Sequence, residues 1–493
     1  MKIVIVGGGT AGWLAALMIS KIRREHSVTV IESSKIGIIG AGEGSTGTLT
    51  NIVQNEMHDL GCNEKDFIKE CDATIKLGIK HIGWNEDPNK FYYGPIDGSP
   101  TSYDGSDIAF LHALGYRDEN LLHIITELGY KIHHNKNSFV EEGGDHAYHF
   151  DAHKVGQYFK RICDTVTHID SEVDEVMLDS ISGYIKALRL SNGTVESGDM
   201  FIDASGFNQI LMKAVGGHWL SYKNNLPVNS ALPFLLPYEE DEKIEPVTNA
   251  WAQRNGWCWQ IPTLNRRGCG YVFCDDFTTP EQAQDELEQT IGKKIDPIRL
   301  LKFESGRQQE LWIKNCLSVG LCAAFAEPLE ATSIHTTIVQ LKSFVYGCIG
   351  RDVEQTCNKL QIAQYNNTMG HLYDTLKDFL VAHYTCGRKD TPFWKFIDSG
   401  DTMTPFVKDM HNMCKYRVPN QSMFNRQEGS AGWPLWSYVL AGTGKLSDYV
   451  CRKELDYNND TFIADASYKQ HIEQHDQKSI NLPDNTQVIR NMQ

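Results

Sequence analysis

The first 32 residues constrain the fold of this chain more than any other stretch. Residues 2–6 form a short apolar, β-branched run of the kind that makes a buried parallel strand. A GxGxxG spacing follows, then a helical apolar pattern over residues 13–22 and a second buried run at residues 28–31. This order, closed by the acidic residue Glu32, predicts a βαβ unit that binds a dinucleotide.

The three glycines of that spacing have separate physical roles. Gly7 makes the tight turn, Gly9 lets the backbone approach a pyrophosphate, and Gly12 allows close packing of helix on strand. The helix N-terminus then faces the phosphates, and the acid accepts a hydrogen bond from a ribose hydroxyl. An ordinary βαβ unit with a loose turn is the alternative. The residues expected to bind the cofactor here are Gly7, Gly9, Thr10, Ala11, Gly12 and Glu32.

A second loop, residues 38–49, is rich in Gly, Ser and Thr and reads IIGAGEGSTGTL. Such a loop can place backbone N–H groups beside a cofactor, and we expect Ala41 and Gly42 to do so. The same composition is also typical of a flexible surface turn.

The length of 493 residues exceeds that of one compact core and predicts two or three structural units. Strand patterns recur up to residue 277, and helical patterns dominate from residue 334. We therefore expect an α/β protein. Its expected parts are a discontinuous cofactor-binding module over residues 1–350 with a strand-rich insertion at about 215–295, a mainly helical substrate-covering region over 351–450, and a polar extension over 451–493.

Composition excludes several functional classes. A formal net charge of -16 argues against a nucleic-acid surface. The 13 cysteines are scattered without a CxxC pair, which indicates a reducing cytoplasm and no disulfide framework. No apolar run reaches membrane-spanning length. A glycine triplet interrupts the apolar stretch at the N-terminus, whereas a signal peptide has an unbroken one. We expect a cytoplasmic protein without nucleic-acid or membrane partners.

Metal binding has one weak candidate. His149 and His153 lie four residues apart in a stretch expected to turn into a helix, with Asp151 as its cap. No further ligand spacing supports a shared ion, so we expect no metal site.

Three later stretches carry residues with chemical potential. Residues 72–80, DATIKLGIK, alternate strictly and predict a strand with one apolar face and Lys76 on the polar face. Residues 256–262 read GWCWQIP, and residues 317–333 read LSVGLCAAFAEPLEATS, a strand-to-helix turn containing Glu330. Taken singly, each has an ordinary interpretation: a solvated lysine, a core pair of tryptophans and a first-turn helix charge.

Taken together, these stretches resemble the flavin-dependent tryptophan halogenases. The likeness runs from residue 2 to about 444, and GWCWQIP matches the family's GWxWxIP signature. The resemblance implies an FAD-binding Rossmann-like module of the GR2 type. It also implies an essential lysine at Lys76, a catalytic glutamate at Glu330, halide-contacting backbone at Thr332 and Ser333, and a barrier between substrate and flavin at Trp257, Trp259, Ile261 and Pro262. The overall likeness favours a cyanophage-encoded member, which would act in the host cytoplasm.

The family reaction implies partners as well as residues. It uses reduced FAD, oxygen and a halide (chloride, bromide or iodide) to make hypohalous acid, and a separate NAD(P)H:flavin reductase supplies the FADH2. The substrate is a small aromatic compound. The resemblance leaves open whether Lys76 forms a haloamine or a hydrogen bond, because that depends on whether burial leaves the amine neutral. It also leaves open whether the protein is a homo-oligomer.

Two other functions are alternatives to halogenation. Aromatic hydroxylases of related fold carry an aspartate directly after the glycine that is Gly320 here, where it binds the flavin ribityl chain; this sequence has Leu321. A non-catalytic flavin-binding protein would need neither Lys76 nor Glu330, and both are present.

The substrate lid departs from the family pattern. Tryptophan-specific members hold the amino acid with adjacent tyrosines, a glutamate and an asparagine, whereas residues 422–442 here read SMFNRQEGSAGWPLWSYVLAG. Glu428 is an unconvincing substitute for the missing carboxylate. Phe424, Trp433 and Trp436 could stack on an arene or simply pack. We therefore expect activity that is not strictly specific for tryptophan.

Overall fold

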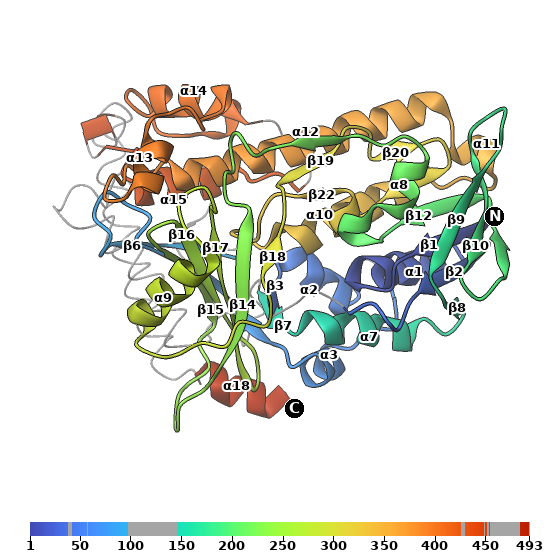
Figure 1. Ribbon diagram of the computed structural model, residues 1–493, viewed down its shortest axis with the longest axis horizontal. Coiled ribbons are helices and arrows are strands. Elements are labelled where there is room, and N and C mark those ends of the chain that lie inside the picture. Colours follow the sequence, from blue (N-terminus) through green and yellow to red (C-terminus); the bar gives the residue numbers. More distant parts are fainter. Residues whose placement is uncertain are drawn as a thin grey trace.

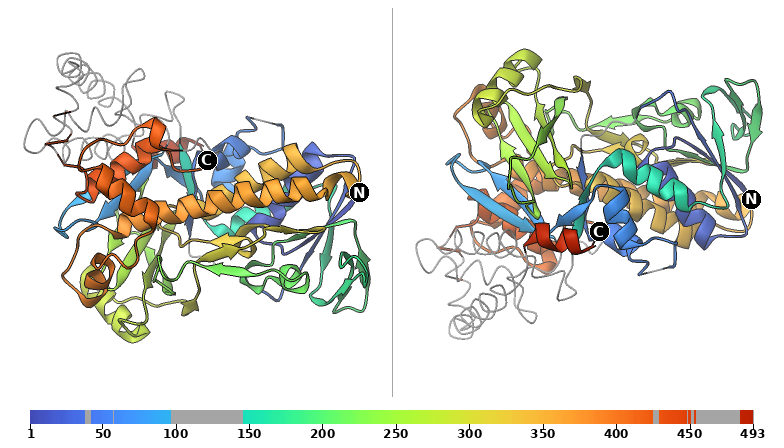
Figure 2. Two further views of the ribbon diagram at one scale, coloured as in Figure 1. Left: turned by 90° about the horizontal axis from the view of Figure 1, so that it is seen from above. Right: turned by 90° about the horizontal axis from the view of Figure 1, so that it is seen from below.

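A computed structural model describes residues 1–37, 42–56, 58–96, 146–424, 429–447, 449–450, 453 and 484–492. Within these residues the chain is a mixed α/β protein built on two large sheets. The long helix α12 (Lys359–Tyr384) runs along the long axis of the molecule, from the N-terminal sheet to the C-terminal helices (Figures 1 and 2). The predicted α/β class is confirmed.

The first sheet contains the predicted βαβ unit. Its six strands run in the order β20-β21-β12-β1-β2-β8, and all neighbours are parallel except β20 and β21. The apolar run predicted to be a buried strand is β1, which is almost wholly buried. The strands are β1 (Lys2–Val6), β2 (Ser27–Glu32), β8 (Thr167–Asp170), β12 (Met200–Asp203), β20 (Trp312–Ile313) and β21 (Cys316–Ser318).

Helix α1 (Thr10–Ile22) is buried over residues 12–20 because other elements cover it on several sides. It contacts β1 and β2 of the sheet, α7 (Ala152–Ile162) and α10 (Thr332–Lys342). A helix enclosed in this way has little amphipathic pattern, since nearly every side chain faces protein. The enclosure fixes the N-terminus of α1, where the GxGxxG loop ends.

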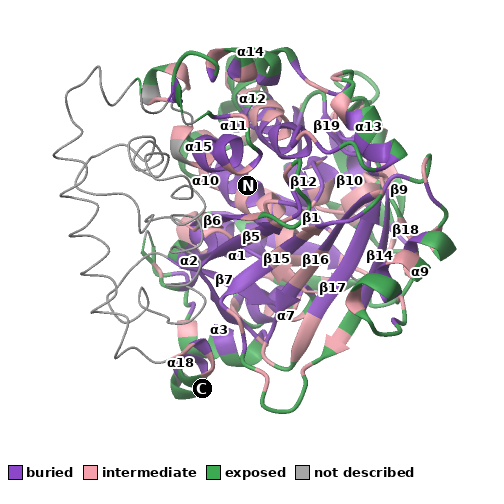
Figure 3. Cartoon of the chain, turned by 90° about the vertical axis from the view of Figure 1, so that its left-hand side faces the viewer, coloured by how far each residue is buried: buried purple, intermediate pink, exposed green. Residues whose placement is uncertain are grey.

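The second sheet has seven strands in the order β18-β14-β17-β16-β15-β5-β6. Its strands are antiparallel except for the pair β15 and β5. GWCWQIP forms β16, near the middle of this sheet. The bounds are β5 (Gly78–Ile82), β6 (Phe91–Pro95), β14 (Ser230–Pro237), β15 (Val247–Ala252), β16 (Gly256–Pro262), β17 (Arg266–Phe273) and β18 (Leu301–Lys302). Figure 3 shows long buried stretches along β14 to β17, with exposed residues concentrated at helices such as α9 (Pro280–Ile291) and α14 (Pro405–Met413).

The prediction of one continuous strand over residues 72–80 is wrong, and the difference decides where Lys76 lies. The stretch divides into β4 (Thr74–Lys76) and β5, with Leu77 between them. Strand β4 belongs to the small sheet β3-β7-β4, whereas β5 belongs to the seven-stranded sheet. Because the chain changes sheets here, both faces of the segment are covered, and Lys76 is 0% exposed.

Three small sheets complete the strands. The Ser-Asn-Gly turn at residues 191–193 joins the antiparallel strands β10 and β11. Residues 91–95 form β6, which pairs with β5. The remaining strands are β3 (Glu43–Gly44), β7 (Ala147–Phe150), β9 (Val173–Leu178), β10 (Ile185–Leu190), β11 (Val195–Ser197), β13 (Trp219–Ser221), β19 (Gly306–Gln308) and β22 (Ala324–Phe325).

The helical pattern predicted from residue 334 is confirmed. The last turn of α10 widens into a π-helical segment, Ser343–Cys348. The other helices are α2 (Gly47–Val53), α3 (Glu64–Glu70), α8 (Ile210–Ala214), α11 (Val353–Thr356), α13 (Pro392–Asp398), α15 (Trp433–Gly442), α18 (Asn485–Met492) and the short 3-10 turns Gly206–Asn208, Gly320–Cys322 and Gln421–Met423. Among the described residues no helix is long and apolar enough to span a membrane.

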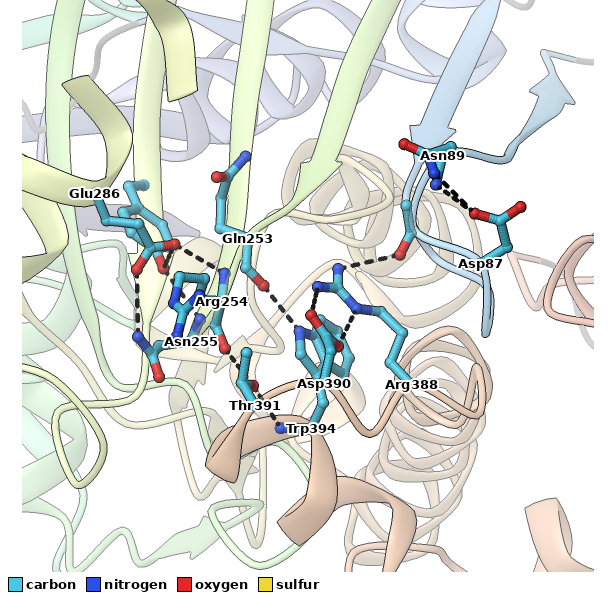
Figure 4. A network of polar contacts seen from close by, with 12 residues as sticks. Asp87, Asn89, Gln253, Arg254, Asn255, Glu286, Arg388, Asp390, Thr391 and Trp394 are labelled. Atoms are coloured by element: carbon cyan, nitrogen blue, oxygen red, sulfur yellow. Dashed lines mark hydrogen bonds and ion pairs between the residues drawn. The ribbon is translucent and has the colours of Figure 1, made fainter. Parts of the chain in front are cut away.

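The helical region is tied to the second sheet by a buried arginine (Figure 4). Arg388 donates two hydrogen bonds to Asp390, at 2.9 and 2.7 Å, and one to the carbonyl of Gly83 at 3.2 Å. Its guanidinium lies 4.8 Å from the ring centroid of Trp394, whose Nε1 donates to the carbonyl of Gln253. These contacts fix the end of α12 against β5 and the β15–β16 turn.

The described end of the polar extension expected over residues 451–493 is a packed helix. Helix α18 contacts α3 and β4, and its Val488 and Ile489 are buried. The carbonyl of Ile244 accepts a hydrogen bond from Asn485 Nδ2 at 3.2 Å. The last residues therefore cover the strand that carries Lys76.

Candidate active site

The glycine loop combines tight packing with one open position. A Cβ on Gly7, whose φ is +115°, would lie 2.2 Å from the carbonyl of Ala204, and one on Gly12 would lie 1.9 Å from the carbonyl of Gly7. A Cβ on Gly9 would have no neighbour within 4 Å. Gly9 is also the N-cap of α1 and offers no side-chain cap. The free first turn of α1 therefore borders open space, as a pyrophosphate requires.

Glu32 lies beside this loop but has partners of its own. Its Oε1 is 2.5 Å from Lys160 Nζ and 2.9 Å from His168 Nε2, and its Oε2 accepts from Trp13 Nε1 at 3.3 Å. A Cβ on Gly8 would clash with the Glu32 carboxylate. The two basic residues, which the sequence pattern did not reveal, hold the carboxylate at the end of β2 next to the loop.

Two further segments carry residues that were expected near the cofactor. Gly42 has a φ of +100° and packs against the backbone of Gly268, with Ile261 close by; Ala41 lies outside the described residues. Gly320 has a φ of +62°, and a Cβ there would lie 2.6 Å from the Cβ of Ala11. The turn that holds Leu321 therefore contacts the start of α1. Thr10 donates its hydroxyl to the carbonyl of Ala152 at 3.3 Å.

Glu43 is a site feature that sequence reasoning missed. It directly follows Gly42, and burial, together with the nearby charge of Asp151, raises its pKa to about 7. A carboxyl group that titrates near neutrality beside a proposed cofactor loop is a functional candidate. Its only sequence signal was its place among the small residues of that loop.

Lys76 is wholly enclosed. Its Nζ donates to the carbonyl of Ser45 at 2.9 Å, and burial lowers its pKa to about 8 against the opposing influence of Glu330. A Cβ on Gly44 would lie 3.1 Å from Lys76 Nζ and 3.6 Å from the Cβ of Ala331. Gly44 thus lets the amine and the segment that follows Glu330 approach each other.

Glu330 lies in a strained turn between β22 and α10. The residues on either side of the segment 328–330, Glu327 and Ala331, have φ values of +58° and +53°. Such conformations cost non-glycine residues about 1–3 kcal/mol each and are concentrated at functional sites. The turn delivers the Glu330 carboxylate, which is 15% exposed, to two imidazoles.

Those imidazoles both approach one carboxylate oxygen. His383 Nε2 is 2.8 Å from Glu330 Oε1 and His81 Nε2 is 3.0 Å from it. Burial alone would raise the pKa of Glu330, but His383 and His81 outweigh burial and hold that pKa well below its ordinary value. Burial lowers the pKa of His81. The carboxylate is therefore strongly held in its ionised form.

Thr332 and Ser333 open α10 immediately after this turn. Ala331 precedes them as the N-cap, without a side-chain hydrogen bond to the helix. The first-turn N–H groups of such a helix favour an anion. This N-terminus lies one residue from Glu330 and close to Lys76.

Strand β16 places three of its four predicted barrier residues on one face. Trp257 and Trp259 have ring centroids 6.2 Å apart, and Ile261 continues the same face as far as Gly42. Trp257 is buried, whereas Trp259 is half-buried with its Nε1 unpartnered. The carbonyl of Pro262 accepts from Thr74 Oγ1 at 2.6 Å. The strand therefore runs from the Gly42 loop to the Glu330 segment.

Glu327 anchors the inner end of that face. Its Oε2 accepts hydrogen bonds from Tyr384 Oη at 2.7 Å and Trp257 Nε1 at 3.4 Å, while Oε1 has no partner. Burial raises its pKa to about 8, so the group is mostly a neutral acid at neutral pH. This second glutamate was not singled out from the sequence.

The metal candidate of the sequence is not assembled. His149 lies on β7 and contacts Thr248 Oγ1 at 2.8 Å, whereas His153 lies on α7; Asp151 caps that helix as expected. The two histidines belong to different elements because residues 147–150 form a strand. Within the described residues, one trio has metal-ligand types close together: His81, Glu330 and His383.

The lid residues mostly pack. Trp436 on α15 is 2% exposed, and its ring lies 5.4 Å from Phe379 and 5.8 Å from Phe424. Trp433 is half-buried. Glu428 lies outside the described residues. Of the interpretations left open by the sequence, packing applies to Trp436 and Phe424.

Comparison with known proteins gives a consistent result. A family model described as tryptophan halogenase matches residues 2–452. Tryptophan 7-halogenase RebH of Lentzea aerocolonigenes is 30% identical over 427 residues, covering 80% of this chain and 78% of that protein. Tryptophan 6-halogenase ThaL of Streptomyces albogriseolus is 31% identical over 433 residues, covering 80% and 78%. The solved structure of Tar14, a tryptophan C-6 flavin-dependent halogenase from taromycin biosynthesis, matches with a TM-score of 0.87 at 28% identity, covering 100% of this chain and 99% of that one.

Proposed function

The chain belongs to the tryptophan halogenase family and is a flavin-dependent halogenase, and from this premise we propose that it uses Lys76 and Glu330 to halogenate small, electron-rich aromatic compounds. One observation carries the assignment of residues. Lys76 is a fully buried amine with a pKa lowered to about 8, and Glu330 is the charged group that opposes this shift. Burying a lysine costs free energy of folding, and a buried group with a shifted pKa is typical of a functional site.

The residues around the glycine loop fit FAD. Gly9 leaves open space at the N-terminus of α1, and the turn that holds Leu321 contacts the start of that helix. Reduced FAD with oxygen supplies the oxidant that converts halide into hypohalous acid. The residues that would hold the cofactor are Gly7, Gly9, Thr10, Ala11, Gly12, Glu32, Gly42 and Leu321.

The halide would be held at the start of α10, by the backbone N–H groups of Thr332 and Ser333. Two features support this placement: an uncapped helix N-terminus and the nearby cationic form of Lys76. The indole face of β16 would separate the flavin from the arene. Trp257, Trp259, Ile261 and Pro262 would then confine the oxidant to a route that ends at Lys76.

Lys76 and Glu330 would act on the oxidant and on the arene in turn. With a pKa of about 8, part of the lysine is neutral near pH 7, so that either a haloamine or a hydrogen bond to hypohalous acid is chemically accessible. Electrophilic attack on the ring gives a cationic intermediate. The ionised Glu330 would stabilise that cation and remove its proton.

The function is tested by product mass. The purified protein is incubated with FAD, a separate flavin reductase, NADH, sodium bromide and indole. We expect a product that carries bromine, and the reaction should stop when bromide or the reductase is left out. A product that gains oxygen would indicate a hydroxylase, and no product would indicate a flavin-binding protein without catalysis.

Free tryptophan is expected to be a poor substrate. Recognition of a zwitterion needs fixed partners for its ammonium and its carboxylate, and leaving either unpaired in a buried site is costly. Helix α15 reads WPLWSYVLAG and contains no charged residue. Competition between tryptophan, indole, phenol and aniline under one halide measures their relative kcat/KM. A kcat/KM that is highest for tryptophan would contradict the expectation.

A further inference from the structure

The two oxygens of the Glu330 carboxylate have unlike surroundings. His383 and His81 both approach Oε1, at 2.8 and 3.0 Å, whereas Oε2 has no hydrogen-bond or ion-pair partner among the described residues. The side chain retains 15% exposure although both imidazoles are buried. The carboxylate is thus anchored through one atom and free at the other.

The anchoring imidazole of His383 is itself fixed from behind. Its Nδ1 lies 2.9 Å from the carbonyl of Phe379, one turn earlier on α12. Both ring nitrogens therefore face oxygens that accept hydrogen bonds. The Phe379 carbonyl, His383 and Glu330 form one line of hydrogen bonds.

His81 closes the other side of the same oxygen. Its ring stacks on Tyr92 with centroids 4.5 Å apart and planes 8° apart, so that its edge faces Glu330. Its contact with Oε1 is not an aligned hydrogen bond, and its Nδ1 has no partner. The stacked ring limits where the carboxylate can turn.

We propose that His383 and His81 are positioning residues that confine Glu330 to one orientation, in which Oε2 alone receives the proton of the arene. The inference rests on the proposed function. In the step concerned, the C–H bond of the cationic ring breaks, its electron pair restores aromaticity, and the proton forms an O–H bond with Oε2. The cationic ring is a far stronger acid than a carboxylic acid, so the location and charge of the acceptor matter more than its basicity.

The charged and titratable groups around Glu330 agree with this arrangement. His81 on β5 and His383 on α12 contact it, Lys76 on β4 interacts with its charge, and Tyr92 on β6 is affected by that charge in turn. The contacts with His383 and His81 keep the acceptor ionised while the arene carries positive charge.

The test uses the full-length protein and ring-deuterated indole. Replacing His383 by Leu should lower halogenation by about 10²-fold, because a displaced base no longer meets the proton. The rate ratio between ordinary and deuterated indole should rise above that of the wild type, because proton removal becomes slow. His383→Gln, which restores a donor at the position of Nε2, should recover part of the rate and the wild-type ratio. His81→Phe, which keeps the stacking on Tyr92, should raise the ratio as well.

Two controls separate positioning from loss of structure. Trp84→Phe alters packing 6.3 Å from the His383 ring but keeps both imidazoles, and His26→Asn removes a buried histidine elsewhere. Both should leave the isotope ratio unchanged. The acidic limb of the pH–rate profile should move upward by about 1–3 units in His383→Leu, because the contact with His383 no longer lowers the pKa of Glu330.

An unchanged isotope ratio and an unchanged acidic limb in a slowed His383→Leu variant would overturn the proposal, leaving His383 with a structural role only. Saturable zinc binding by the wild type that leaves halogenation intact and is lost in His383→Leu would overturn it too, by making the trio a metal site. A wild-type protein that does not brominate indole would instead refute the proposed function, independently of the variants.

Discussion

Burial of Lys76 lowers the free energy of unfolding of the protein at neutral pH. Its ordinary pKa of 10.5 falls to about 8 in the folded state because the amine is buried. Below pH 8 the folded state must bury a charge that the unfolded chain exposes to water, and above pH 10.5 neither state carries it. The penalty is therefore complete at neutral pH and disappears as the pH rises from 8 to 10.5.

Lys76→Met should separate stability from activity. We expect no halogenation, unchanged FAD affinity, and a free energy of unfolding at pH 7 that is higher by about 3 kcal/mol, the equivalent of the pKa shift. The difference from the wild type should shrink when urea unfolding is repeated at pH 9 and pH 10. A variant that is less stable than the wild type at pH 7 would contradict this account of the buried amine.

Glu327 should show the opposite dependence on pH. Burial raises its pKa from 4.5 to about 8, so the folded state holds a proton that the unfolded chain releases. Relative to Glu327→Gln, the wild type should therefore lose stability as the pH rises from 5 to 8. Urea unfolding of both proteins across that range checks this. Glu327→Ala should be the less stable variant, because Trp257 and Tyr384 both lose an acceptor.

At the scale of elements, the junction around Arg388 predicts a defect confined to stability. Arg388→Lys removes the paired hydrogen bonds to Asp390, because an ammonium cannot reproduce the planar fork. We expect the free energy of unfolding to fall by about 1.5–3 kcal/mol. Lys389→Arg, on the adjacent exposed residue, is the matched control and should have no measurable effect. Loss of FAD affinity in Arg388→Lys would show that the junction reaches the cofactor loop.

The elements were predictable where one local pattern decides the structure. The first βαβ unit, the hairpin at residues 191–193 and the helical C-terminal half follow from apolar spacing and turn residues. The break at Leu77 was not predictable, because strict alternation gives no sign that the partner strand changes. Nor could the sequence bring His81 and His383 to Glu330, since the three come from β5, α12 and the turn before α10.

At the scale of the whole molecule, the chain is expected to depend on another protein for reduced flavin. The sequence has one glycine fingerprint that follows a buried parallel strand, and the described residues contain no second βαβ unit of that kind. Purified protein with FAD and NADH should therefore oxidise NADH only at the background rate until a flavin reductase is added. The absorbance of NADH at 340 nm measures this. Fast oxidation without the reductase would reveal a nicotinamide site.

The change of sheets at Leu77 has a consequence for how the reaction centre is encoded. Lys76 and His81 are five positions apart, an odd number, and an unbroken strand would direct them to opposite sides. Both nevertheless act on Glu330, since the chain leaves one sheet after Lys76 and enters another at Gly78. Adding or removing a single residue at this joint would turn one side chain away while leaving every reactive group in the sequence. The number of residues at this joint thus decides whether Lys76 and His81 can both reach Glu330.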